Sequence, residues 1–376
     1  MKATTITPGL IKNTNRMLIY NLLYSRKRLS QQDIALELKL SRPTIATNLA
    51  EMERVGMIFK DGQLSSDQIG RKAVAYSIVP DYRVAIGVEI IQSCIKLIAI
   101  NLYGKKMKRV VIDLEFSMTD YYYREVCTHI HNFIESLSFT KEQILGIGFS
   151  IQGLVSADYK RVIYGKILDC TGLTIDSFAQ YLDYPCNFIH DSEASAITET
   201  WFDSSIQNAF ILHLSYHLGA AIVQNGQIWR GKHGHNGTVE HITLHSNGPK
   251  CYCGKNGCAE TFCSLKALLQ GEDQNEFFQK VRDGEADAVE RWQRFLTYLA
   301  ELINMLHLAH DIDFVFSGYL SENIINEDLD FIYEKLRVLS PFVEAADFLK
   351  IGNRIHHSNT IGAALPYIKA FLEDLV

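Results

Sequence analysis

The chain has 376 residues, 47% of them hydrophobic, which is enough for two or three domains with a sizeable core. No apolar run approaches the roughly 20 residues that span a bilayer, and the N-terminus lacks the apolar stretch of a signal peptide. These features exclude a membrane-spanning or secreted class. We therefore expect a cytoplasmic protein without a membrane partner.

The net charge of −6 is unevenly distributed along the chain. Residues 1–80 carry twelve Lys and Arg against six Asp and Glu, a balance of +6, which leaves −12 on the rest. A basic head on an acidic body is typical of proteins whose head binds nucleic acid.

The first 80 residues have the pattern of three helices followed by a hairpin. Apolar side chains at near-helical spacing predict a first helix over residues 10–24. Ser30, with Asp33 three residues later, predicts the N-cap of a second helix. A capping hydroxyl and an early proline within residues 41–44 predict the start of a third helix, which Gly56 ends.

A helix, a short turn and a second helix form the arrangement with which many proteins read DNA. Asp61-Gly62 predicts a two-residue hairpin turn behind these helices, which would be a wing, and residues 70–72 offer a basic clip for a minor groove. A small domain for protein contacts is the alternative, but pattern, capping and charge all favour DNA. The expected DNA-contacting residues, from the exposed face of the third helix and the clip, are Ser41, Arg42, Thr44, Thr47, Asn48, Arg71 and Lys72.

From about Tyr82 the pattern becomes that of an α/β protein. The expected elements are strands over 84–90, 95–102 and 108–114, a helix over 122–137, and strands over 144–150 and 186–189. The last strand runs into Asp191, and we expect Ser192 to cap a helix that continues through Trp201. An acidic residue at a strand end beside a helix start is a common place for a functional group.

A similar order of elements follows residue 208. It comprises strands over 208–214, 219–224 and 227–229, helices over 262–310, a strand over 313–316 and a helix over 361–375. We therefore expect two similar lobes, residues 82–190 and 191–360, with the C-terminal helix 361–376 packing back on the first lobe.

One short segment, His241 to Glu260, has the composition of a metal site. Three cysteines lie close together with two glycines between them, and a histidine lies ten residues upstream. A reactive or incidental cysteine cluster and a disulfide are the alternatives, and Cys263 is interpreted as a packed thiol. Three thiolates and one imidazole would complete a tetrahedron, so we expect a structural zinc ion held by His241, Cys251, Cys253 and Cys258.

The winged helix-turn-helix, the two similar halves and the motif His-x9-Cys-x-Cys-Gly-x-x-Gly-Cys-x-Glu together resemble the ROK family (repressor, open reading frame, kinase). The resemblance covers nearly the whole chain and is greatest to the branch of xylose and N-acetylglucosamine repressors. It implies an actin-like, ribonuclease-H-like α/β fold for residues 82–376, with a sugar in the cleft between the lobes.

The resemblance also implies roles for particular residues. The Asn-Asp pair of the ROK kinases, whose Asp is the general base, is His190-Asp191 here, so Asp191 would be a vestigial base. The family's Gly-Glu-x-Gly-His becomes residues 237–241, where Thr238 replaces the sugar-binding Glu. The sugar-binding residues implied are His190, Asp191, Glu240, His241 and Glu260.

Both phosphate-binding loops of the kinases are altered. The Asp-x-Gly-Gly-Thr turn, whose glycines let backbone amides approach ATP, corresponds to residues 89–93, where Ile91 and Gln92 replace both glycines. In the second loop, residues 215–221, only Gly219 remains. We therefore expect no enzymatic turnover, and an ATP-dependent sugar kinase carrying a DNA-binding head is the alternative.

The expected function is a sugar-responsive transcriptional regulator that binds operator DNA as a homodimer or homotetramer. Its effector would be a sugar or a sugar phosphate that closes the cleft and changes the separation of two DNA-binding heads. The residues leave open a protein partner in the cleft instead of a sugar.

Overall fold

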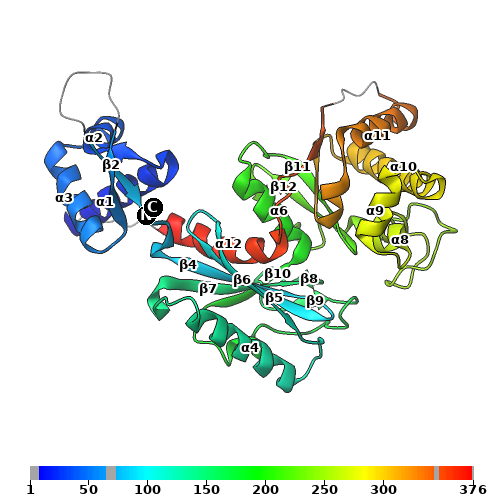
Figure 1. The fold of residues 1–376 in the computed structure, drawn as a ribbon, viewed down its shortest axis with the longest axis horizontal. Helices are drawn as coiled ribbons and strands as arrows, with labels where there is room; N and C mark the ends of the chain where they lie inside the picture. Colours follow the sequence, from blue (N-terminus) through cyan, green and yellow to red (C-terminus); the bar gives the residue numbers. More distant parts are fainter. Residues whose placement is uncertain (1–7, 65–72, 343–346, 375–376) are drawn as a thin grey trace.

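The computed structural model describes residues 8–64, 73–342 and 347–374 (Figure 1). It contains a small helical head with a three-stranded sheet, followed by a body with two five-stranded sheets. None of the described helices is both long enough and apolar enough to cross a membrane.

Three helices form the head, and local capping explains where two of them begin. The Ser30 side chain accepts a hydrogen bond from the Asp33 amide, and the Asp33 carboxylate accepts one from the Ser30 amide. The Ser41 hydroxyl accepts from the Thr44 amide in the same way. Both predicted caps are confirmed. The head elements are α1 (Pro8–Arg26), β1 (Leu29–Ser30), α2 (Gln31–Leu38), α3 (Arg42–Arg54), β2 (Ile58–Gln63) and β3 (Val74–Ile78).

The predicted hairpin turn at Asp61-Gly62 is wrong. Strand β2 continues through these residues and pairs antiparallel with β3, and the pairing shifts register between Lys60 and Gln63. Asp61-Gly62 is therefore a bulge inside a strand. Because a bulge and a tight turn both use a residue with positive φ, here +69° at Gly62, the sequence signal is the same for both. The connection from β2 to β3, with Arg71 and Lys72, lies outside the described residues.

The two sheets of the body have the same order and direction of strands. Counted from the edge strand that comes last among the parallel ones, the first sheet has the order β10-β7-β4-β5-β6 and the second has the order β15-β14-β11-β12-β13. In each sheet, three consecutive strands form an antiparallel meander. A fourth strand pairs in parallel with the first strand of the meander, and a fifth strand pairs in parallel with the fourth. The predicted similarity of the two halves is confirmed. The strands are β4 (Val84–Ile90), β5 (Cys94–Asn101), β6 (Lys106–Asp113), β7 (Ile144–Ile151), β10 (Cys186–His190), β11 (Ala209–Leu214), β12 (Leu218–Gln224), β13 (Gln227–Ile228), β14 (Asp313–Ser317) and β15 (Leu349–Ile351).

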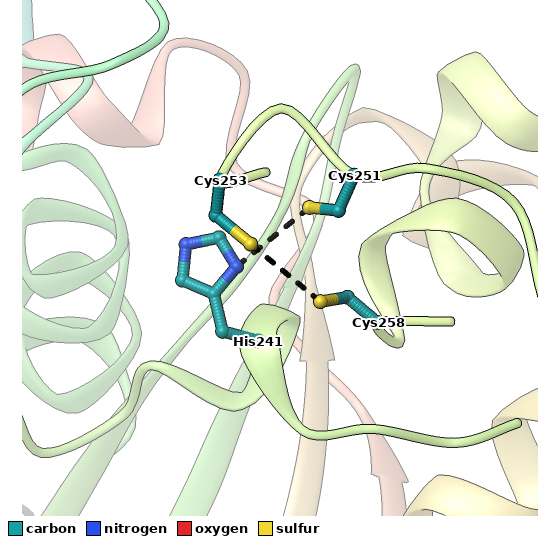
Figure 2. A group of neighbouring side chains, drawn as sticks. All are labelled: His241, Cys251, Cys253 and Cys258. Carbon is teal, nitrogen blue, oxygen red and sulfur yellow. Dashed lines mark hydrogen bonds between the residues drawn. The ribbon is translucent and has the colours of Figure 1, made fainter. Parts of the chain in front are cut away.

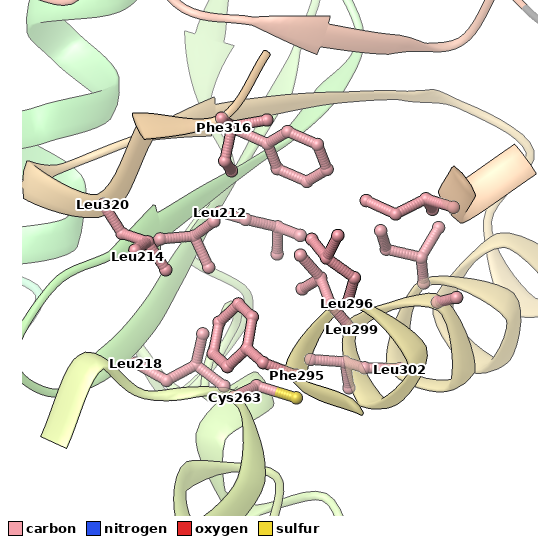
Figure 3. Close-up of a cluster of buried hydrophobic side chains, with 14 of the residues drawn as sticks. Leu212, Leu214, Leu218, Cys263, Phe295, Leu296, Leu299, Leu302, Phe316 and Leu320 are labelled. Atoms are coloured by element: carbon pink, nitrogen blue, oxygen red, sulfur yellow. The ribbon is translucent and has the colours of Figure 1, made fainter. Parts of the chain in front are cut away.

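Each sheet has its own hydrophobic core. Helix α4 covers one face of the first sheet (Figure 1). In the second lobe, Phe295 and Leu299 of α10 pack against Leu212 and Phe316 of the sheet (Figure 3). The remaining elements are α4 (Asp120–Glu135), β8 (Leu154–Val155), β9 (Val162–Tyr164), α5 (Asp176–Ala179), α6 (Asp191–Phe202), α7 (Glu260–Cys263), α8 (Leu265–Leu269), α9 (Gln274–Arg282), α10 (Ala286–Ala309), α11 (Asn326–Leu339) and α12 (Ser358–Asp374).

Helices α6 and α12 connect the two lobes. Helix α6 follows a strand of the first sheet but contacts β11 and β12 of the second, whereas α12 follows the second sheet and packs on β4, β5 and β7 of the first. A Cβ atom added at Gly148 would lie 1.8 Å from the Ala363 carbonyl oxygen, and one at Gly362 would lie 1.8 Å from that of Ala194. Backbone therefore touches backbone at these crossings, and only glycine fits.

The head shares a core with the body. Tyr20 and Leu23 of α1 lie in one buried cluster with Leu102 and with Leu365 of α12. The hydroxyl of Tyr24 donates a hydrogen bond to the Leu102 carbonyl at 3.0 Å. The head is thus packed directly against the first lobe and the C-terminal helix.

Candidate functional site

The four predicted metal ligands lie together in the structure (Figure 2). All their ligand atoms are within 4.8 Å of one another. The Sγ atoms of Cys253 and Cys258 are 3.7 Å apart, and Cys251 Sγ is 3.8 Å from His241 Nδ1. Two sulfur atoms bound to one tetrahedral zinc at about 2.3 Å are about 3.8 Å apart. These two separations fit such an ion, and the four side chains form a possible metal site.

The structure does not support the disulfide alternative. All eight cysteines are free, and the 3.7 Å between the two nearest sulfur atoms of the cluster far exceeds the roughly 2.05 Å of a disulfide. Cys263 is fully buried in the core of the second lobe, in agreement with its interpretation as a packed thiol. The loop of the cluster requires Gly257, where φ is +73° and a Cβ would lie 1.6 Å from the His245 carbonyl oxygen.

A pocket lined by residues of both lobes lies between them, beside this cluster. Of the predicted sugar-binding residues, the structure brings His190, Asp191 and Glu240 to its wall. His241 and Glu260 are not among the described residues that line it.

Asp191 is the first residue of α6, and His190 is the N-cap. The predicted cap at Ser192 is wrong, because Asp191 already has helical conformation and Ser192 lies in the first turn. The Ser192 amide donates to Asp191 Oδ1 at 2.8 Å, and His190 Nε2 lies 3.2 Å from the same oxygen. These contacts hold one carboxylate oxygen, and the positive end of the helix favours the negative charge.

Glu240 is buried beside the pocket. Burial raises the pKa of its carboxyl to about 8. Its Oε2 atom has no hydrogen-bond partner among the described residues, and neither has the Nε2 atom of His241. Buried polar atoms are nearly always paired in proteins, so two unpaired atoms here indicate that a polar ligand or water completes the site.

The structure also shows pocket residues that sequence reasoning missed. Tyr164, His217 and Tyr252 line the pocket. Tyr252 stands between two metal ligands in the sequence, and His217 lies in the altered second loop. These positions in the chain were the sequence signals that could have assigned both residues to the pocket.

Glu89, the first residue of the segment that corresponds to the first kinase loop, is bound by side chains of the protein itself. Glu89 forms a buried ion pair with Lys96, 3.2 Å between Oε2 and Nζ. The other donors to Glu89 are Asn359 Nδ2 at 3.2 Å and Thr360 Oγ1 at 3.0 Å, both at the start of α12. Lys96 Nζ also donates to the Tyr319 hydroxyl at 2.9 Å, which joins the two lobes.

His213 separates this region from the interlobe pocket. It is 2% exposed and lines both the pocket that holds Asp191 and a neighbouring one of about 390 Å³ beside Glu89. Burial lowers the pKa of the imidazole. A bulky buried ring therefore stands between the expected sugar position and the altered phosphate loop.

On the DNA-reading helix α3, the structure exposes Ser41, Arg42 and Thr47 and leaves Thr44 half-buried. The expected exposure of Asn48 is wrong, because its side chain is 3% exposed and its Nδ2 donates to the Thr44 carbonyl at 2.8 Å. It shares the inward face with the buried residues Ile45, Leu49 and Met52. Pro43, Ala46, Ala50 and Arg54, which were not predicted, are also exposed on α3.

Fold and site together define a class of protein: a two-lobed α/β body with a duplicated sheet and a Cys3His cluster, carrying a winged helix-turn-helix head. The chain belongs to the ROK family, whose model matches residues 85–364. A winged helix-turn-helix DNA-binding model matches residues 12–58. Both matches confirm the resemblance seen in the sequence.

Several repressors are similar to this chain. The xylose repressor of Caldicellulosiruptor bescii is 24% identical over 288 residues, which cover 76% of this chain and 71% of that protein. The xylose repressor of Bacillus subtilis is 24% identical over 263 residues, 69% of this chain and 68% of that protein. The DNA-binding transcriptional dual regulator NagC of Escherichia coli is 25% identical over 267 residues, 69% of this chain and 65% of that protein.

Solved structures show the same fold in regulators and kinases. A ROK family transcriptional regulator, a homologue of the E. coli MLC protein, superposes with a TM-score of 0.75 at 20% identity and 97% coverage of both chains. A ROK family glucokinase from Streptomyces griseus, in complex with glucose and AMPPNP, gives 0.67 at 18% identity, with 75% of this chain and 98% of that chain covered. The expected actin-like, sugar-kinase-like fold with an N-terminal winged helix-turn-helix is confirmed.

Proposed function

We propose that this ROK protein is a sugar-responsive DNA-binding repressor. The observation that carries the proposal is the presence, in one packed unit, of a DNA-reading helix and an interlobe pocket lined by Asp191 and Glu240. Relatives named xylose repressor and N-acetylglucosamine repressor support the same function. The effector is a sugar or sugar phosphate bound in that pocket.

The protein performs no phosphoryl transfer in this proposal, and Asp191 is a vestigial base. Phosphoryl transfer depends on clamping the transferred phosphate with amides and cations. The absence of such a clamp is supported by Ile91 and Gln92, which stand in place of the two glycines of the first kinase loop, and by the engagement of Glu89 with Lys96. The alternative, a sugar kinase with a DNA-binding head, is favoured only by the Asp191 carboxylate at the start of α6.

Zinc is the proposed ion of the cluster, held by His241, Cys251, Cys253 and Cys258. The spacing of the four ligand atoms supports it. With four protein ligands the ion is structural, since a catalytic zinc keeps an open position. It stabilises the loop that carries Tyr252 to the pocket and Glu260 to its partners.

Residues 1–80 are the proposed DNA-binding unit, and Ser41, Arg42, Thr44 and Thr47 its contacts. Because Asn48 is buried, we assign it to the packing of α3 instead of to base contacts. Arg71 and Lys72 remain the proposed minor-groove clip. Recognition of a symmetric operator requires two heads, so the working form is a homodimer or homotetramer.

The test has two arms. Selection of the full chain on random double-stranded DNA should yield a common sequence, and D-xylose, D-glucose, N-acetyl-D-glucosamine or one of their phosphates should change its binding. ATP-dependent phosphorylation of any of these sugars, abolished by Asp191→Asn, would establish the kinase alternative.

A further inference from the structure

Glu260, the glutamate that the family resemblance assigns to the sugar, is fully engaged with the protein. Its Oε1 accepts a hydrogen bond from His217 Nδ1 at 2.6 Å, and its Oε2 accepts one from the Leu218 amide at 2.8 Å. The side chain is only 5% exposed. The carboxylate is thus placed behind His217, which does line the interlobe pocket.

The hydrogen bonds determine which nitrogen of His217 faces a ligand. A carboxylate only accepts hydrogen bonds, so Nδ1 carries a hydrogen atom and donates the hydrogen bond to Glu260. The structure shows a hydrogen bond from His217 to a described residue through Nδ1 and none through its other nitrogen, Nε2. In the neutral ring this nitrogen is an acceptor.

Neighbouring rings fix the orientation of this imidazole. The rings of Tyr216 and Tyr252 stand nearly perpendicular to it, at centroid distances of 5.2 Å and 5.6 Å. Edge-to-face contacts of this kind are favourable and directional. His217 therefore presents a preoriented Nε2 atom to the pocket, next to Tyr252.

We propose that His217, and not Glu260, makes the direct contact with the effector, and that Glu260 is a positioning residue that acts through His217. This inference rests on the proposed sugar-binding function. A free carboxylate can accept hydrogen bonds from two neighbouring hydroxyls, whereas the single Nε2 atom of the imidazole makes one hydrogen bond. The site thus requires a single hydroxyl at this point of the sugar and tolerates the loss of its neighbour.

The experiment is calorimetric titration of the full chain with D-xylose, D-glucose, N-acetyl-D-glucosamine and their phosphates, and then with monodeoxy forms of the sugar that binds. Loss of one hydrogen bond in His217→Phe should weaken binding about tenfold. His245→Gln is the matched control, because His245 forms a similar pair with Glu301, at 2.9 Å, but does not line the pocket. Its affinity should equal that of the original protein.

Nitrogen-15 spectra of the histidine rings separate positioning from contact. On addition of the sugar, the Nε2 signal of His217 should shift. In Glu260→Gln the preference for protonated Nδ1 should be lost and the affinity should fall. This spectrum needs only the unaltered protein and Glu260→Gln, so it stands even where His217→Phe does not fold.

Each result decides the matter. If His217→Phe binds as tightly as the original protein while Glu260→Gln loses binding, Glu260 is the direct ligand and the inference is wrong, although the proposed function survives. An unchanged Nε2 signal in the sugar complex leads to the same conclusion. If none of the sugars or phosphates binds the original protein, the proposed function fails and takes the inference with it.

Discussion

The ion pair between Glu89 and Lys96 gives the most quantitative prediction about the altered phosphate loop. Lys96 is 13% exposed and Glu89 6% exposed, and the lysine also joins β5 to Tyr319 of the other lobe. In Lys96→Met the apolar stem remains but the charge is lost. The carboxylate of Glu89 then stays buried with only two neutral donors, from Asn359 and Thr360.

Removal of one partner from a buried ion pair costs about 3–5 kcal/mol, because the remaining charge is uncompensated. The two neutral donors to Glu89 soften this penalty, so we expect a loss of about 3 kcal/mol in the free energy of unfolding for Lys96→Met. Glu89→Gln combined with Lys96→Met should cost less than the sum of the single changes, since no buried charge is left.

Urea denaturation of the four proteins, followed by circular dichroism, measures these differences. Lys60→Met is the control, because Lys60 also pairs with a glutamate, Glu53 at 3.0 Å, but on an exposed surface where such pairs contribute little. Its midpoint should not change measurably. If Lys96→Met is as stable as Lys60→Met, the ion pair does not stabilise this loop and our account of it is wrong. The same conclusion follows if the losses in the free energy of unfolding from Glu89→Gln and Lys96→Met are additive.

Three further predictions concern other parts of the molecule. Arg42→Ala should weaken binding to the selected DNA by about 1–3 kcal/mol if this residue reads a base. Asn48→Ala should instead lower the melting temperature of the protein and leave its DNA sequence preference intact. The reverse pattern in a DNA-binding assay would restore Asn48 as a DNA contact. Metal analysis should find zinc in the purified protein. Cys251→Ser should release the zinc and lower the melting temperature, whereas Cys186→Ser, outside the cluster, should retain the zinc. A metal-free native protein would contradict the zinc assignment. Gly362→Ala should destabilise the protein by about 1–3 kcal/mol or more through the clash with the Ala194 backbone. A free energy of unfolding equal to that of the original protein would show that the helix crossing yields.

Local and repeated patterns were readable from the sequence. Capping at Ser30 and Ser41 depends on residues three apart, and the two meanders depend on alternation within each strand, so both were predicted without knowledge of tertiary contacts. The metal cluster was predicted for the same reason, because three of its four ligands lie within eight residues.

What the sequence did not reveal depends on contacts between distant segments. Asn48 is an exception: it lies three residues after Ile45 and four before Met52, so helical spacing already places it beside the buried face, and its polar type alone led to the wrong expectation. The partner of Glu260 lies 43 residues away, at His217. Asp61-Gly62 supports either a turn or a bulge, and the choice depends on how far β2 continues along β3.

The central claim is that sugar binding in the body and DNA binding by the head are coupled. Coupling is reciprocal, so bound DNA must change the affinity for the effector by the same factor by which the effector changes the affinity for DNA. Calorimetric titration of the active sugar into the full chain, with and without saturating selected DNA, measures this factor directly. We predict affinities that differ severalfold or more between the two titrations. Equal affinities would show that the pocket does not control the head and would contradict the account.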